Sequence, residues 1–94
     1  MSLEFEWDDA KAASNYAKHG IAFQHAVKVF LDPYAIERID DREDYGEARM
    51  NLLGGCDGVI LHVTYTERAG RIRVISARRA NKYERDDYYR ENTI

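Results

Sequence analysis

Three stretches of alternating side chains, separated by short turns, restrict this chain to folds built on an antiparallel sheet. The stretches are Arg49–Leu53, Val59–Thr66 and Arg71–Ser76. Side chains that alternate along an extended segment point to opposite faces of a strand. The connections, at residues 54–58 and 69–70, contain glycine, and turns this short join antiparallel neighbours. The sequence therefore predicts an antiparallel meander.

Alternation assigns the side chains of these stretches to two faces. The face expected to form the core is apolar and holds Met50, Leu52, Val59, Leu61, Val63, Ile72 and Val74. The opposite face is polar and mostly cationic, and holds Arg49, Asn51, His62, Thr64, Thr66, Arg71 and Arg73. Antiparallel sheets commonly leave one face in solvent. Arginine, however, has a planar fork that suits phosphate, whereas lysine is the usual charge on exposed strands. Two interpretations stay open, a solvated face and an anion-binding face.

Helices are predicted on both sides of this strand-rich region. Asp9–His19 is rich in Ala and Lys, with Asp8 as the N-cap and Gly20 at the left-handed position that ends a helix. A second, amphipathic α-helix is predicted over residues 23–31, because its apolar residues recur at i, i+3, i+4, i+7 and i+8. These residues are Phe23, Ala26, Val27, Phe30 and Leu31. A last helix is expected from about Arg79 to Arg90.

Two further strands complete the predicted fold. They are Leu3–Trp7 and Tyr34–Ile39, and an acidic surface loop, Asp40–Glu47, follows the second. The fold class is α+β, in the order β-α-α-β-β-β-β-α, with the antiparallel meander packed on two N-terminal helices. Because 94 residues allow one modest core, residues 1–94 are expected to form a single domain.

Charge and composition narrow the classes of function. The chain has 14 basic and 17 acidic residues, a formal net charge of −3, so any attraction for phosphates must be local. Six basic residues lie between positions 66 and 82 against one acid, Glu67. We expect neither a membrane span, which needs roughly 18–20 apolar residues, nor a signal peptide. Cys56 has no partner for a disulfide within the chain, which fits a reducing cytosol.

Motifs for metals and nucleotides are missing from the sequence. With one cysteine and no His-x3-His spacing, we expect no metal site and no cofactor. Glycine-rich phosphate loops are also absent. His62 has the near-neutral pKa that a general base needs, although a lone histidine is more often a structural residue. Glu47 is the second candidate base, or simply the last solvated acid of its loop.

Four motifs extend over most of the chain, residues 5–89. The first is Phe5-Glu-Trp-Asp-Asp-Ala-Lys11 with Asn15 and Lys18-His19-Gly20. The second is Phe23 to Val29 with Phe30-Leu-Asp-Pro33, and the third is Glu47-Ala-Arg49. The fourth is Tyr65-Thr-Glu-Arg68 followed by Arg73-Val-Ile-Ser-Ala-Arg78. Together these motifs resemble the BrnT family of bacterial ribonuclease toxins.

The resemblance implies a RelE-like fold and endoribonuclease activity in the bacterial cytoplasm. The chain would be the toxin of a type II toxin–antitoxin pair, with mRNA as its substrate. Its protein partner would be a BrnA-like antitoxin encoded by the adjacent gene. DNA would be contacted only through that antitoxin, and no membrane would be involved.

Metal-independent cleavage of RNA requires a base for the 2′-OH, an acid for the leaving 5′ oxygen and cations for the pentavalent intermediate. The candidate catalytic residues are Arg73, Arg78, Arg68, Lys11, Glu47 and His62, the last two as alternative bases. The residues expected to bind RNA are Arg49, Arg71, Arg79 and Lys82.

One of these candidates, Arg78, conflicts with strict alternation. A regular strand would place Arg78 on the face opposite to Arg73. The resemblance implies that the strand ends within residues 76–78, where the chain would turn Arg78 toward the same anion. The alternative function is a catalytically inactive module that docks an acidic protein or RNA through the basic face.

Overall fold

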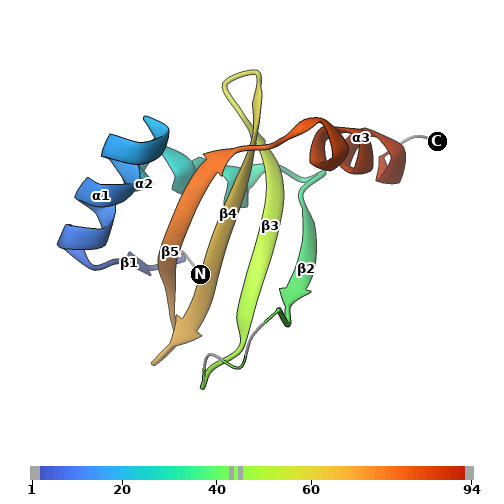
Figure 1. The fold of residues 1–94 in the computed structure, drawn as a ribbon. Coiled ribbons are helices and arrows are strands. Elements are labelled where there is room, and N and C mark those ends of the chain that lie inside the picture. Colours follow the sequence, from blue (N-terminus) through green and yellow to red (C-terminus); the bar gives the residue numbers. More distant parts are fainter. Residues whose placement is uncertain (1–2, 43, 45, 93–94) are drawn as a thin grey trace.

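The structure of the chain is a computed structural model that describes residues 3–42, 44 and 46–92. Its elements are β1 (Phe5–Glu6), α1 (Asp9–His19), α2 (Phe23–Ala26), the 3₁₀ helix η1 (Val27–Leu31), β2 (Ile36–Asp40), β3 (Arg49–Cys56), β4 (Val59–Arg68), β5 (Arg71–Arg79) and α3 (Lys82–Glu91). The strands form one sheet in the order β1-β5-β4-β3-β2 (Figure 1). Strands β2 to β5 are antiparallel, as predicted, but the sheet is mixed because β1 pairs with β5 in parallel. The predicted α+β class is confirmed.

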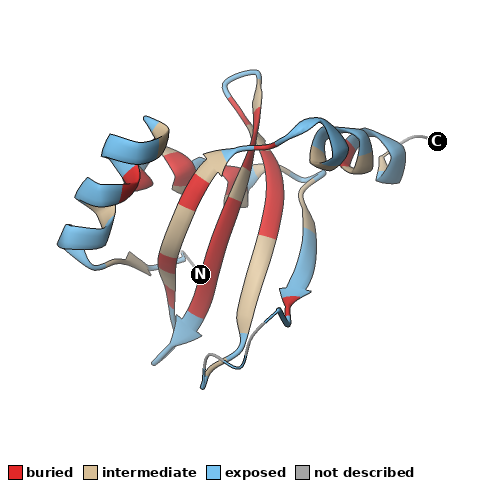
Figure 2. Ribbon diagram, viewed as in Figure 1, coloured by how far each residue is buried: buried red, intermediate tan, exposed pale blue. Residues whose placement is uncertain are grey.

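The core lies between the sheet and the helices of the N-terminal part (Figures 1 and 2). The predicted apolar face is confirmed, since its residues are either buried or packed against the buried cluster. The buried ones are Leu52, Leu61, Val63, Ile72 and Val74. A smaller cluster forms where α3 covers one end of the other face, and it consists of Leu53, Ile60, Ala80 and Tyr88. Within the described residues, none of the helices has the length and apolar character needed to cross a membrane.

The prediction of one continuous α-helix over residues 23–31 is wrong. α2 completes about one α-helical turn and continues as the 3₁₀ helix η1. Leu31, on the predicted apolar stripe, is 81% exposed. A 3₁₀ helix has three residues per turn, so its inward side follows a period of 3.0 rather than 3.6. The fully buried residues follow that period, and they are Phe23, Ala26 and Val29.

The two glycines predicted to form a turn, Gly54 and Gly55, lie inside β3 instead. They pair with β4, and the turn is confined to residues 57 and 58. A Cβ atom on Gly54 would lie 2.9 Å from the Cβ of Val29 and 3.1 Å from its carbonyl oxygen. Glycine is therefore required for the close approach of η1 to the sheet.

The strand β5 does not end at Ser76 but continues to Arg79, so the last helix begins later than predicted, at Lys82. Its pairing with β4 shifts by one residue: Ser76 lies opposite Thr64, whereas Val74 lies opposite Tyr65. The extra residue between them, Ile75, makes a β-bulge. The extra residue shifts the alternation of side chains by one position. Residues that follow Ile75 therefore face the side opposite to the one that strict alternation from Arg71 would predict.

The predicted acidic loop is partly strand. Asp40 is the last residue of β2, and only 1% of its side chain is exposed. Its carboxylate accepts hydrogen bonds from Arg42 Nε and Nη2, at 2.8 and 2.9 Å. The expectation that Asp40 is a solvated loop residue is therefore wrong. Residues 43 and 45 of the same predicted loop lie outside the described residues.

Helix α1 begins and ends as predicted, and it also covers an edge of the sheet. The carboxylate of Asp8 accepts the backbone N–H of Lys11 at 3.0 Å, and Gly20 has a φ of 71°. Beyond β1, the edge of β5 would be open. The amide of Asn15 pairs with it, because Asn15 Oδ1 accepts from Ala77 N at 3.1 Å and Nδ2 donates to Ala77 O at 2.8 Å. Nδ2 also donates to the carbonyl of Ile21.

Replacing Asn15 by alanine is expected to lower the free energy of unfolding by about 2–3 kcal/mol. The variant leaves buried backbone groups at Ala77 without partners, and each such group costs roughly 1–3 kcal/mol. Urea denaturation followed by circular dichroism measures the change. The exposed neighbour Ser14, replaced by alanine as a control, should change the value by less than about 0.5 kcal/mol. Equal effects at the two positions would contradict the role of Asn15 as an edge partner.

Candidate active site

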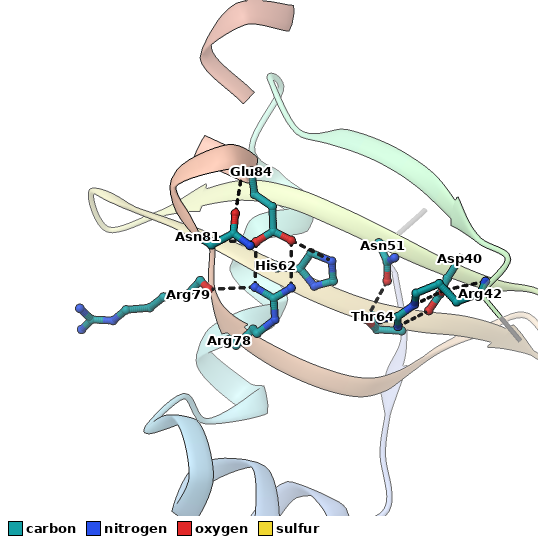
Figure 3. A network of polar contacts seen from close by, with 9 residues as sticks. All are labelled: Asp40, Arg42, Asn51, His62, Thr64, Arg78, Arg79, Asn81 and Glu84. Carbon is teal, nitrogen blue, oxygen red and sulfur yellow. Dashed lines mark hydrogen bonds and ion pairs between the residues drawn. The ribbon is translucent and has the colours of Figure 1, made fainter. Parts of the chain in front are cut away.

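The polar face of the sheet brings a histidine, an arginine and a glutamate together where α3 begins. His62 of β4 lies directly opposite Arg78 of β5, so both side chains point to the same face. Arg78 Nη1 and Nη2 donate to the two carboxylate oxygens of Glu84, at 2.8 and 2.9 Å (Figure 3). The Nε2 atom of His62 lies 3.7 Å from Glu84 Oε2. We call these three residues the His–Arg–Glu cluster.

The first turn of α3 holds Glu84 in place. Asn81 is the N-cap, and its side chain accepts the backbone N–H of Glu84 at 2.9 Å. The Glu84 carboxylate accepts the backbone N–H of Asn81 in return, also at 2.9 Å. This reciprocal arrangement is a capping box. Because the arrangement immobilises the carboxylate, Glu84 presents a fixed negative charge to both Arg78 and His62.

The environment of the His–Arg–Glu cluster lowers the pKa of both titratable members. Burial lowers the pKa of His62, and the nearby Arg78 charge lowers it further, against a smaller opposing effect of Glu84. For Glu84, burial alone would raise the pKa, but hydrogen bonds from Arg78 and Asn81 outweigh burial, so the pKa is lowered. His62 is therefore neutral and Glu84 ionised near pH 7. His62 Nδ1 is buried and has no hydrogen-bond partner among the described residues.

The polar face continues from this cluster along β3 and β4. Thr64 Oγ1 donates to Asn51 Oδ1 at 2.8 Å, and the pair of Asp40 and Arg42 lies beyond it (Figure 3). These contacts form a polar floor beside the His–Arg–Glu cluster. Elsewhere, within the described residues, one group of side chains lies close enough together to hold a metal ion. It is found at the β3–β4 turn and consists of His25, Cys56 and Asp57.

The second candidate base, Glu47, lies far from His62. Glu47 Oε1 accepts a hydrogen bond from Arg68 Nη2 at 2.8 Å, and Oε2 lies 3.5 Å from Arg49 Nε. Arg68 is six residues beyond His62 on β4, a separation of roughly 20 Å along the strand. The hydrogen bond from Arg68 lowers the pKa of Glu47, which makes it a weaker base. Glu47, Arg49 and Arg68 therefore lie together at the end of the sheet that is farther from the His–Arg–Glu cluster.

Arg73 and Arg78 lie on the same face, contrary to strict alternation. The bulge at Ile75 inserts one extra residue between them, which brings both side chains to the same face. Arg73 lies opposite Thr66, and Arg78 lies opposite His62. Four residues of β4 separate these positions, roughly 13 Å. At that distance Arg73 and Arg78 cannot hold one anion together. They can contact two separate points on an extended chain.

The prediction of a mostly cationic face is wrong, because acidic residues from distant segments neutralise its arginines. Arg73 Nη1 donates to Glu6 Oε2 at 2.7 Å, and Arg71 Nε donates to Glu4 Oε2 at 3.2 Å. Both glutamates come from the segment of β1, which precedes these arginines by 67 residues. The local excess of positive charge in the sequence is therefore not an excess of charge on the folded surface.

Three further predicted residues, in addition to those described above, lie outside the His–Arg–Glu cluster. Lys11 of α1 lines a groove beside β5 together with Lys18, His19, Ile75 and Ser76. Arg79 is exposed, and its side chain points away from the cluster (Figure 3). Lys82 lies 3.7 Å from Asp86 on the surface of α3.

Glu84 was not among the residues predicted from the sequence. Its signal was present, because Asn81-Lys-Tyr-Glu84 has the N-cap and N3 residue types of a capping box. That pattern places Glu84 in the first turn of a helix that begins shortly after Arg78. The prediction of a helix beginning at Arg79 concealed it.

Comparison with known proteins identifies the family. A family model described as "Ribonuclease toxin, BrnT, of type II toxin-antitoxin system" matches residues 7–84. The match includes all three residues of the His–Arg–Glu cluster. A comparison with curated proteins finds no similar sequence. The description supports a ribonuclease activity and implies a cognate antitoxin as partner. Because the match covers most of the 94 residues, the chain belongs to the BrnT family of ribonuclease toxins of type II toxin–antitoxin systems.

Proposed function

We propose that the protein is a metal-independent endoribonuclease that cleaves mRNA at the His–Arg–Glu cluster. The observation that supports this site best is a histidine of lowered pKa beside an arginine that is held by Glu84 in a bidentate pair, on the polar face of the sheet. A neutral imidazole accepts a proton, and the planar guanidinium fits a phosphate. The two groups supply a base and an electrostatic partner for the same phosphodiester.

In the proposed reaction His62 takes the proton of the 2′-OH. The 2′ oxygen then attacks the adjacent phosphorus, and the bond from phosphorus to the 5′ oxygen breaks. Arg78 stabilises the negative charge that develops on the phosphate, while the Glu84 carboxylate balances the imidazolium that forms on His62. The leaving 5′ oxygen takes its proton from solvent water. Lys11, which lies outside the cluster in the groove beside β5, is proposed to contact a phosphate of the RNA. The products are a 2′,3′-cyclic phosphate and a 5′-hydroxyl end.

The remaining predicted cations are assigned to binding the RNA chain. Arg73 lies on the same face as Arg78, roughly 13 Å along the sheet, and is proposed to contact a flanking phosphate. Arg49, Arg68 and Arg71 extend this path toward the far end of the strands. Glu47 is proposed to orient Arg68 and Arg49 rather than to act as a base.

The wider setting follows from the family and from the sequence. We propose that the fold is RelE-like and that the protein acts in the cytoplasm. Its partner is proposed to be a BrnA-like antitoxin that carries the DNA-binding function of the pair. The alternative is a catalytically inactive module that docks an acidic protein or RNA through the same face. It is less favoured, because binding alone gives no role to a histidine of lowered pKa held beside Glu84.

Replacing Arg78 by alanine is expected to lower the rate of RNA cleavage about 100- to 1,000-fold. The variant removes a cation that meets the transition state, and such a loss costs roughly 2.7–4 kcal/mol. The measurement is incubation of a defined mRNA with protein in EDTA, with product ends analysed for cyclic phosphate. Wild-type protein that gives no cleavage, or cleavage only with added Mg²⁺, would contradict the proposed function.

Arg90→Ala is the matched control for this experiment. It removes one positive charge from the exposed surface of α3, where Arg90 pairs with Asp87, and should change the rate less than twofold. Circular dichroism checks that both variants are folded. If Arg78→Ala cleaves as fast as Arg90→Ala, the assignment of Arg78 is wrong.

A further inference from the structure

A second cluster of polar side chains lies where the β3–β4 turn meets α2. Cys56 is the last residue of β3, and the turn that follows has a φ of 50° at Asp57 and 83° at Gly58. Positive φ at both central residues indicates a type I′ turn. This turn holds the side chains of Cys56 and Asp57 beside α2. His25 of α2 completes the cluster.

The three donor atoms are spaced as ligands of one tetrahedral ion. His25 Nε2 lies 3.2 Å from Cys56 Sγ and 3.4 Å from Asp57 Oδ2. Cys56 Sγ lies 3.8 Å from Asp57 Oδ2. In a tetrahedral Zn²⁺ site with ordinary bond lengths, neighbouring donor atoms are about 3.3–3.6 Å apart. The observed spacing therefore allows one ion to contact all three atoms after small adjustments.

We propose that His25, Cys56 and Asp57 form a Zn²⁺ site with a fourth coordination position open to solvent. A thiolate, an imidazole and a carboxylate together favour Zn²⁺ over the hard cations Mg²⁺ and Ca²⁺, which prefer oxygen ligands only. The proposal departs from the prediction that the chain has no metal site. That prediction considered only the single cysteine and the spacing of histidines close together in the sequence. His25 and Cys56 are 31 residues apart, so no short motif reveals them.

The surroundings of the site permit an ion to enter. Cys56 is buried, but the side chains of His25 and Asp57 are 44% and 65% exposed. Lys28 Nζ lies 3.7 Å from Asp57 Oδ2 and must move away when the ion binds. It sits on the surface with 55% of its side chain exposed, so it can rotate into solvent. The thiol loses its proton as the metal binds.

A bound ion would tie two distant parts of the chain together. The β3–β4 turn would be linked to the α2–η1 segment, which packs on the core through Phe23 and Val29. The ion would also adjoin a pocket lined by Lys28, Asp32 and Tyr88. Because only the folded chain holds the three ligands together, binding stabilises the fold by mass action. The site is separate from the His–Arg–Glu cluster, so RNA cleavage does not depend on it.

The test uses full-length, tag-free protein that has been treated with EDTA and desalted. Titration with Co²⁺, a spectroscopic substitute for Zn²⁺, should give one equivalent bound, a thiolate charge-transfer band and the d–d bands of tetrahedral Co²⁺. Zn²⁺ should displace it. A hundredfold excess of free Zn²⁺ over Kd should raise Tm by about 10–20 °C.

Three ligand variants and one control decide the assignment. His25→Gln and Cys56→Ala should each weaken Zn²⁺ binding by about 100-fold or more, and Cys56→Ala should also abolish the charge-transfer band. Asp57→Asn keeps a residue that tolerates positive φ and should weaken binding at least about tenfold. The control, His62→Gln, should bind as the wild type does. Binding without a thiolate band, or unchanged affinity in Cys56→Ala, would overturn the site.

Discussion

His62→Gln is expected to lower RNA cleavage about 100- to 10,000-fold, the range over which a general base contributes to a rate. Glutamine keeps a polar side chain beside Glu84, where the imidazole of His62 lies, but does not accept a proton at neutral pH. Arg78 and Glu84 stay in place, because their bidentate pair does not depend on the histidine. The loss should therefore appear in turnover much more than in RNA binding.

The pH dependence of the wild type distinguishes a base from a structural histidine. Because the pKa of His62 is lowered from 6.5, the residue stays neutral until the pH falls below that value. The kcat/KM of the wild type should be constant near neutrality and fall with decreasing pH, through an apparent pKa below 6.5. In His62→Gln the acid limb should disappear. Circular dichroism at each pH separates titration of His62 from acid unfolding.

His25→Gln in metal-free buffer is the matched control. It makes the same chemical change at a histidine outside the polar face, and cleavage should stay within about twofold of the wild type. A His62→Gln protein that keeps the acid limb and loses less than tenfold in rate would assign the proton transfer to another group.

The second large effect concerns the core. Phe23→Ala is expected to lower the free energy of unfolding by about 3–5 kcal/mol, the usual cost of removing a large buried ring. Phe23 is completely buried and meets Trp7 edge-on, with ring centroids 5.9 Å apart. The cavity that forms cannot be filled by the sheet, whose strands are held by their ladders. Urea denaturation with a constant m value measures the change.

Leu31→Ala serves as the comparison, because the sequence pattern places Leu31 on the same apolar stripe as Phe23. With 81% of the residue exposed, its replacement should change the free energy of unfolding by less than about 0.5 kcal/mol. A loss of 2 kcal/mol or more at Leu31 would mean that residues 27–31 form a regular α-helix and not a 3₁₀ helix.

The sequence by itself determined the strands of the meander and their two faces. Leu61 and Val63 on one side and His62 and Thr64 on the other follow from a period of two residues. That period is local, because each side chain is placed by its own backbone. The ends of α1 were predicted for the same reason, since Asp8 and Gly20 act on adjacent backbone groups.

Only the tertiary structure decided what the polar face contains. The bulge at Ile75, which sets Arg78 beside His62, depends on pairing between two strands and has no signature in the spacing of β5 alone. Glu84 reaches Arg78 because α3 folds back over the sheet. Charge neutralisation works in the same way, since Glu6 meets Arg73 only after β1 adds to the edge of β5. The local capping box at Asn81 positions Glu84, but only the pairing of β4 with β5, between residues distant in the sequence, brings His62 to Arg78 and so completes the candidate site.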